Sequence, residues 1–161
     1  MRATRLAVGL AAGMLAGGCG DGGGEPLTKA GFLTRGNAVC ARTQQAIDEG
    51  ARATFTSPGN VPTAEEVGRF VDDTLLPQMR RELRELGELE PPQDDRDRVN
   101  AILGAGRQGV DRISTNPGIV LDKERNPLIL YSDLADAYGL EGCGRNSDET
   151  ARALAGLKPA E

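Results

Sequence analysis

The chain has 161 residues, of which 39% are apolar and 27% are charged, so its length and composition suit one domain with a core of ordinary size. It contains no histidine and no tryptophan. The lack of histidine excludes Ser-His and Cys-His nucleophile pairs and any zinc site that depends on imidazole, and the net charge of −5 argues against nucleic-acid binding.

The first residues have the pattern of an export signal. Arg2 and Arg5 precede an apolar run over 6–16, which is too short to span a bilayer but suits the core of a signal peptide. Small residues at 16–18 then lead to Cys19. This stretch resembles the lipobox of bacterial lipoproteins, although the third position before the cysteine holds alanine where leucine is usual.

The lipobox resemblance implies cleavage before Cys19 and attachment of acyl chains such as palmitate, which would anchor the protein to the extracytoplasmic face of the bacterial cell membrane. The alternative is ordinary secretory cleavage that leaves Cys19 as a free thiol. The glycine-rich stretch that follows predicts a flexible tether. The expected organisation is a lipoprotein signal peptide over 1–18, the lipidated cysteine and tether over 19–26, a helical domain over 27–146, and a short C-terminal helix or frayed tail over 147–161.

Two further cysteines, Cys40 and Cys143, lie near the two ends of the predicted helical domain. An even pair in an oxidising, exported compartment predicts one disulfide. The alternative is two buried free thiols. A metal site is disfavoured, because the chain has no CxxC motif and no histidine near them.

The first predicted helix runs over 28–51, with Thr28 as its N-cap. Its apolar residues recur at helical spacing and place Cys40 on the side that faces the core. A stretch rich in Ser, Pro, Gly and Asn over 54–62 predicts a loop.

The second predicted helix opens with a capping box formed by Thr63 and Glu66. Apolar residues then recur every three or four positions over 67–86, and the Pro-Pro pair at 91–92 ends the helix. Pro77 lies inside this run and predicts a helix that is kinked or split there. The apolar phase continues across Pro77, which favours a kink.

Charged side chains fill much of the same helix: Arg80, Arg81, Glu82, Arg84, Glu85, Glu88 and Glu90. We interpret them as a solvated surface with ion pairs four residues apart, such as Arg81–Glu85. The alternative is contact with an anion or a partner through Arg80 and Arg84, which share a helix face.

Asp94, Asp95 and Asp97 precede a third predicted helix over 99–113. A calcium loop of the EF-hand type would need a glycine and a distal glutamate that this stretch lacks. We therefore interpret the three aspartates as N-terminal capping charges.

Within the third helix, Gly104, Gly106 and Gly109 reproduce the G-x-G-x-x-G pattern of dinucleotide-binding folds. That pattern binds a nucleotide only between a strand and a helix of a parallel sheet. Here the surrounding residues keep a helical period, so we expect the glycines to permit close contact between helices.

Asn126-Pro127 predicts the start of a last helix, with Gly139 as its left-handed C-cap. Three apolar residues in it are spaced by four, which suits a helix: Leu130, Leu134 and Tyr138.

Three patterns in the body are similar to those of small uncharacterised bacterial lipoproteins and secreted helical proteins: Lys29-x-x-Phe32 with Cys40, Leu76-Pro77-x-x-Arg80, and Tyr138-Gly139 with Cys143-Gly144. The resemblance implies an exported α-helical domain with one disulfide, and it implies no activity.

The sequence thus predicts an all-α fold, a four-helix antiparallel bundle closed by one disulfide between Cys40 and Cys143. We expect a membrane-anchored, non-catalytic interaction or binding module without cofactor, bound metal, nucleic acid or nucleotide. Its expected partners are the lipid bilayer, through acylated Cys19, and an envelope protein. The alternatives are a carrier of a small ligand or ion with a pocket between helices, and a hydrolase that works without histidine.

Overall fold

The computed structural model describes residues 26–55, 63–122 and 124–145. The predictions for the signal peptide, for Cys19 and for the tail over 147–161 lie outside the described residues. Within them the chain is entirely helical, without strands, and the all-α prediction is confirmed. None of the described helices is both long enough and apolar enough to cross a bilayer.

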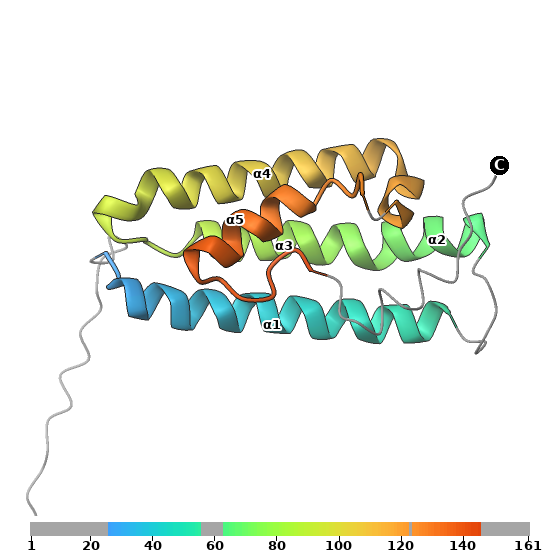
Figure 1. Cartoon of the computed structure of the whole chain (residues 1–161). Helices are drawn as coiled ribbons and strands as arrows, with labels where there is room; N and C mark the ends of the chain where they lie inside the picture. Colours follow the sequence, from blue (N-terminus) through green and yellow to red (C-terminus); the bar gives the residue numbers. More distant parts are fainter. Residues whose placement is uncertain (1–25, 56–62, 123, 146–161) are drawn as a thin grey trace, which may run out of the picture.

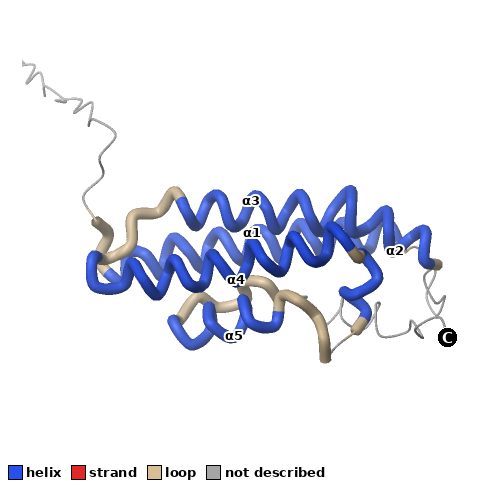
Figure 2. Tube along the Cα trace, turned by 90° about the horizontal axis from the view of Figure 1, so that it is seen from above, coloured by secondary structure: helices blue, strands red, loops and turns tan. Residues whose placement is uncertain are grey.

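Five α-helices make up most of the described chain: α1 (Lys29–Thr54), α2 (Ala64–Phe70), α3 (Leu76–Gly87), α4 (Arg96–Thr115) and α5 (Ile129–Tyr138). A π-helical segment (Val71–Leu75) joins α2 to α3, and two 3₁₀ turns (Gln93–Asp95 and Pro117–Leu121) flank α4. Helix α3 lies beside both α1 and α4, and the shorter α5 packs against α4 (Figures 1 and 2). One core runs between them, and its largest fully buried side chains come from all five α-helices, from the π-helical segment and from Leu140 in the turn after α5.

Helix α1 begins where the sequence predicts. The hydroxyl of Thr28 accepts a hydrogen bond from the Gly31 N–H at 3.1 Å and so caps the first turn. The buried side of the helix includes Phe32, Cys40 and Ile47. Cys40 therefore faces the core, as its spacing predicts.

The capping box of the second helix is also confirmed. The Glu66 N–H donates to the Thr63 hydroxyl at 3.2 Å, and the Thr63 N–H donates to the Glu66 carboxylate at 2.7 Å. This reciprocal pair satisfies two donors that a helix start leaves without intrahelical partners.

Pro77 does not divide the second helix, because the backbone stays helical without a break over 64–87. Its ring would crowd the carbonyl of Asp73, four residues earlier, in a regular α-helix. The turn just before it is instead a π-helix (Val71–Leu75), in which the Leu76 N–H donates to the Val71 carbonyl. The wider π turn gives the ring room, so the apolar side stays in phase across the proline.

Negative charge lies at the start of α4, as the sequence predicts, with Asp95 as the N-cap residue and Asp97 in the first turn. Asp95 makes no capping hydrogen bond, however, and its carboxylate accepts a hydrogen bond from the Tyr138 hydroxyl at 2.9 Å. Of the three residues spaced by four in the last helix, Tyr138 is buried, whereas Leu130 is 57% exposed. Spacing by four drifts around a helix of 3.6 residues per turn, so it does not mark one face.

Buried side chains follow a spacing of three and four that starts just before α5: Leu128, Tyr131, Ala135 and Tyr138. Asn126 does not cap the helix. Its side chain accepts from the Leu128 N–H at 3.0 Å, and α5 begins only at Ile129. Gly139 ends the helix with φ of 104°, as the predicted left-handed C-cap requires.

The glycine pattern lies wholly inside α4, as the helical interpretation predicts. A Cβ at Gly106 would collide with Leu83 and lie tightly against the Tyr131 ring, whereas a Cβ at Gly104 would meet nothing within 4 Å. The two positions thus differ in packing, although both lie in the same helix.

We predict opposite effects for alanine at these two glycines. Gly106→Ala should lower the free energy of unfolding by about 1–3 kcal/mol through overpacking. Gly104→Ala should raise it by about 0.5–1 kcal/mol through helix propensity. Chemical denaturation of both variants checks the prediction, and equal effects at the two positions would contradict it.

Candidate functional site

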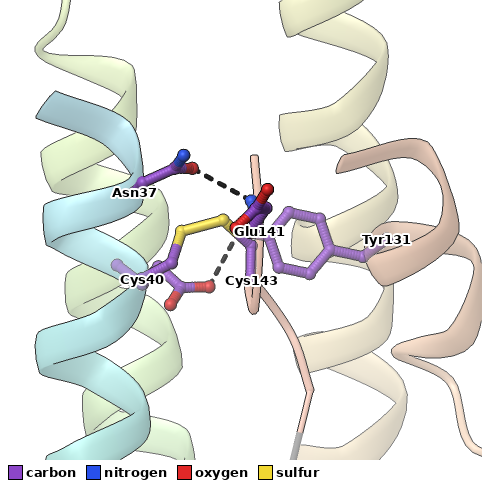
Figure 3. The surroundings of a disulfide bond; sticks show 6 residues. Asn37, Cys40, Tyr131, Glu141 and Cys143 are labelled. Carbon is purple, nitrogen blue, oxygen red and sulfur yellow. Dashed lines mark hydrogen bonds between the residues drawn. A yellow bond between two sulfur atoms is a disulfide. The ribbon is translucent and has the colours of Figure 1, made fainter. Parts of the chain in front are cut away.

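The disulfide between Cys40 and Cys143 joins α1 to the turn that follows α5 (Figure 3). The two Cα atoms are 4.8 Å apart, and both residues are fully buried. A hydrogen bond of 2.9 Å from the Glu141 N–H to the side chain of Asn37 fixes the same turn on α1. The predicted disulfide is thus present, and it holds the turn over 139–145 against the first helix.

The carboxyl group of Glu82 lies beside the disulfide. Its residue is only 1% exposed, and its oxygen and the two cysteine sulfurs all lie within 4.8 Å of one another. The interpretation of Glu82 as part of a solvated surface is therefore wrong. Glu82 faces the core because it stands in phase with Met79 and Leu86, which are also buried.

Three donors from three different parts of the chain reach the Glu82 carboxyl. The Tyr131 hydroxyl of α5 donates at 2.8 Å, and the Thr43 hydroxyl of α1 and the Gly144 N–H of the C-terminal turn donate as well. Within the described residues, every buried side-chain nitrogen and oxygen has a hydrogen-bond partner. The carboxyl thus joins α1, α3, α5 and the turn at one point, which we name the Glu82 cluster: Glu82, Thr43, Tyr131 and Gly144.

Burial is the dominant influence on Glu82, since it disfavours the charged form and raises the pKa of its carboxyl from 4.5 to about 7. The three hydrogen bonds act in the opposite direction and offset part of that rise. Burial and the neighbouring carboxyl also raise the pKa of the Tyr131 hydroxyl, so the tyrosine stays neutral. Glu82 is therefore the group in the cluster that gains or loses a proton near neutral pH.

Gly144 has a specific reason to be glycine. Its φ is 67°, and a Cβ there would collide with the Tyr131 ring. The turn can therefore bring its N–H to Glu82 only without a side chain at this position.

The chemistry open to this cluster is limited by its surroundings. The carboxyl is buried, its oxygens already accept hydrogen bonds, and Glu82 lines neither of the two grooves described below. Two thiolates and a carboxylate would suit a zinc ion. In the disulfide, however, the sulfurs are bonded to each other, which leaves Glu82 as the one free ligand of the three.

Two surface grooves flank α3 on opposite sides. The groove toward α1 has a volume of about 260 Å³ and contains two ion pairs, from Arg42 to Glu85 at 2.8 Å and from Arg81 to Glu85 at 2.6 Å. The predicted pair Arg81–Glu85 is thereby confirmed. These guanidinium groups hold the pKa of the Glu85 carboxyl below its usual value.

The groove toward α4 has a volume of about 340 Å³ and is lined by six residues: Arg80, Leu83, Arg84, Arg107, Val110 and Asp111. The structure thus brings Arg80 and Arg84 together, as their shared face predicts, and adds Arg107 from α4. Sequence reasoning missed Arg107, because no local spacing signals which residue of another helix lies opposite.

Comparison with known proteins gives no match: no protein-family model, no curated protein and no solved structure is significantly similar to the chain. The assignment of function therefore depends on the sequence and on the geometry described above.

Proposed function

We propose that the chain is an exported lipoprotein, anchored at the extracytoplasmic face of the bacterial cell membrane through acylated Cys19. Its body, a four-helix antiparallel bundle, serves as a binding or interaction module and catalyses no reaction. The partners that this proposal implies are the lipid bilayer and a component of the cell envelope.

The observation that carries the proposal is the succession of an export signal with a lipobox-like cysteine, a glycine-rich stretch and a disulfide-linked helical body. The Leu27 N–H donates to the Glu90 carbonyl at 3.0 Å, so the entry to α1 is fixed beside the connection between α3 and α4. A tether from Cys19 would thus reach the body at one end. The two grooves along α3 would remain open to the surroundings of the membrane.

The interior supports binding over catalysis. Glu82 is a buried acid with a strongly raised pKa, which is a property shared by many catalytic groups. Its oxygens are taken up by Tyr131, Thr43 and Gly144, so it links structural elements instead of facing a cleft.

Lipidation is tested by expressing the full chain in a bacterial host and analysing the membrane fraction by mass spectrometry. We expect a mature chain that begins at Cys19, carries acyl groups and needs detergent for extraction. The matched control is Cys19→Ser, which should lose the acyl mass. An unmodified Cys19 in a protein released without detergent would contradict the proposal.

Interaction with an envelope component is tested by crosslinking on intact cells followed by purification of the acylated chain. A specific crosslinked partner that is lost when α3 surface arginines are replaced would support an interaction module.

A second candidate function, a carrier of a small ligand with a pocket between helices, is favoured by the groove between α3 and α4.

A further inference from the structure

We propose that the groove between α3 and α4 is a binding site for the phosphate group of a phosphate monoester. The inference rests on the proposed binding module and names its ligand class. Three guanidinium groups, from Arg80, Arg84 and Arg107, line this groove over the apolar side chains of Leu83 and Val110.

The three arginines are available for a ligand. All three are exposed, and none forms an ion pair or hydrogen bond with another side chain in the described part of the chain. On the other side of α3, by contrast, Glu85 forms ion pairs with both Arg42 and Arg81, and Glu49 in the same groove balances the second positive charge. The same helix thus carries a compensated groove and an uncompensated groove, in a protein whose net charge is negative.

The charge of the groove matches a phosphate monoester. Three arginines and Asp111 leave an excess of two positive charges, which suits a dianion. Each guanidinium offers a planar set of N–H donors and no acceptor. Donors that come from α3 and from α4 suit the tetrahedral oxygens of phosphate better than the two coplanar oxygens of a carboxylate.

Asp111 adds a requirement for the rest of the ligand. Its carboxylate is an acceptor only, so it would repel phosphate oxygens and accept a hydrogen bond from a hydroxyl group. A hydroxylated phosphate ester, such as the phosphate of a small polyol, satisfies both the arginines and Asp111. The apolar floor of Leu83 and Val110 would contact the carbon skeleton of such a ligand.

Isothermal titration of the full chain carrying Cys19→Ser tests the site with free glycerol 3-phosphate and inorganic phosphate. We expect saturable binding of both, with tighter binding of glycerol 3-phosphate. Arg84→Gln should weaken binding about tenfold or more through the loss of a charge-assisted hydrogen bond. Arg81→Gln, the matched change on the opposite side of α3, should leave the affinity within about twofold.

A vesicle arm distinguishes a lipid headgroup from a free ligand. Phosphatidylcholine vesicles that contain phosphatidic acid present the same phosphate monoester on a membrane, and vesicles of phosphatidylcholine alone are the control. Binding to the vesicles with phosphatidic acid but not to glycerol 3-phosphate would assign the site to the headgroup. Binding to glycerol 3-phosphate but not to these vesicles would assign it to a free ester.

The outcomes separate this proposal from lipidation. The proposal is overturned by a lack of saturable binding to every probe, or by an equal loss of affinity in Arg81→Gln and Arg84→Gln. Asp111→Ala should abolish the preference for glycerol 3-phosphate over inorganic phosphate, and an unchanged preference would overturn the role of Asp111. None of these results depends on the acylation of Cys19, which mass spectrometry tests independently.

Discussion

Replacing both Cys40 and Cys143 by alanine should lower the free energy of unfolding by about 4–5 kcal/mol relative to the oxidised protein. The disulfide closes a loop between residues that are 103 positions apart, and long loops gain most from closure because the unfolded chain loses more conformational freedom. We choose alanine over serine as the replacement, because serine would place a hydroxyl group in a fully buried site that has evolved around sulfur and not around a hydrogen-bonding group.

Denaturant unfolding of the wild type and of the double variant, each with and without reductant, provides the measurement. The reductant should bring the wild type close to the double variant and leave the double variant unchanged. A difference below about 1 kcal/mol between the oxidised wild type and the variant would contradict the prediction.

In the cysteine double variant, the turn that carries residue 143 should become more mobile, in addition to the fall in the free energy of unfolding. The turn over 139–145 would still be held by the hydrogen bond from Glu141 to Asn37 and by the buried side chain of Leu140. These contacts are fewer than those of the long helices, so amide hydrogen exchange should increase first in this turn.

The parts of the fold that the sequence predicts correctly depend on local signals. The capping box of Thr63 and Glu66 and the left-handed Gly139 are both where the pattern places them, because each satisfies backbone groups within a few residues. The disulfide was predictable for a different reason: with Cys19 expected to carry lipid, the expectation of export leaves one cysteine pair, and one pair allows a single pairing.

The parts that the sequence does not predict depend on contacts between distant segments. Glu82 stands among charged neighbours, and its burial follows from donors contributed by Thr43 and Tyr131 on other helices. In α5, Tyr131 lies in the core, where its hydroxyl donates to Glu82, whereas Leu130 is exposed. The π turn before Pro77 likewise needs three-dimensional packing to decide between a break and a wider turn.

One side chain, Glu82, should make the free energy of unfolding fall by about 3 kcal/mol as the pH rises from 4.5 to 7. Its pKa is about 7 in the folded protein and 4.5 in the unfolded chain, so the folded state keeps a proton that the unfolded state has lost. This contribution is complete below pH 4.5 and is lost as the pH rises through 7.

The amino-acid composition allows the contribution of Glu82 to the pH dependence of stability to be measured separately. The chain has no histidine, and Cys40 and Cys143 are joined in the disulfide, so they do not titrate. Neighbouring arginines lower the pKa of Glu85 and of Asp122, and those two carboxylates therefore change stability only at lower pH, where stability falls as they are protonated. The wild type should thus be most stable near pH 4.5 to 5.

Denaturant unfolding at several pH values compares the wild type with Glu82→Gln, which keeps the shape of the side chain and cannot ionise. The fall between pH 4.5 and 7 should disappear in Glu82→Gln and remain in Glu85→Gln, the same change on the solvent side of α3. A wild type whose stability is constant over this range would contradict the assignment of Glu82.

The two predictions are coupled through the turn that carries Gly144. In the cysteine double variant this turn is held less firmly, so water should reach the Glu82 carboxyl and move its pKa back toward 4.5. The fall in stability between pH 4.5 and 7 should then be smaller in the double variant than in the wild type. An equal fall in both proteins would show that the disulfide does not keep water from the carboxyl, and that the packing of Tyr131 and Thr43 is sufficient for its burial.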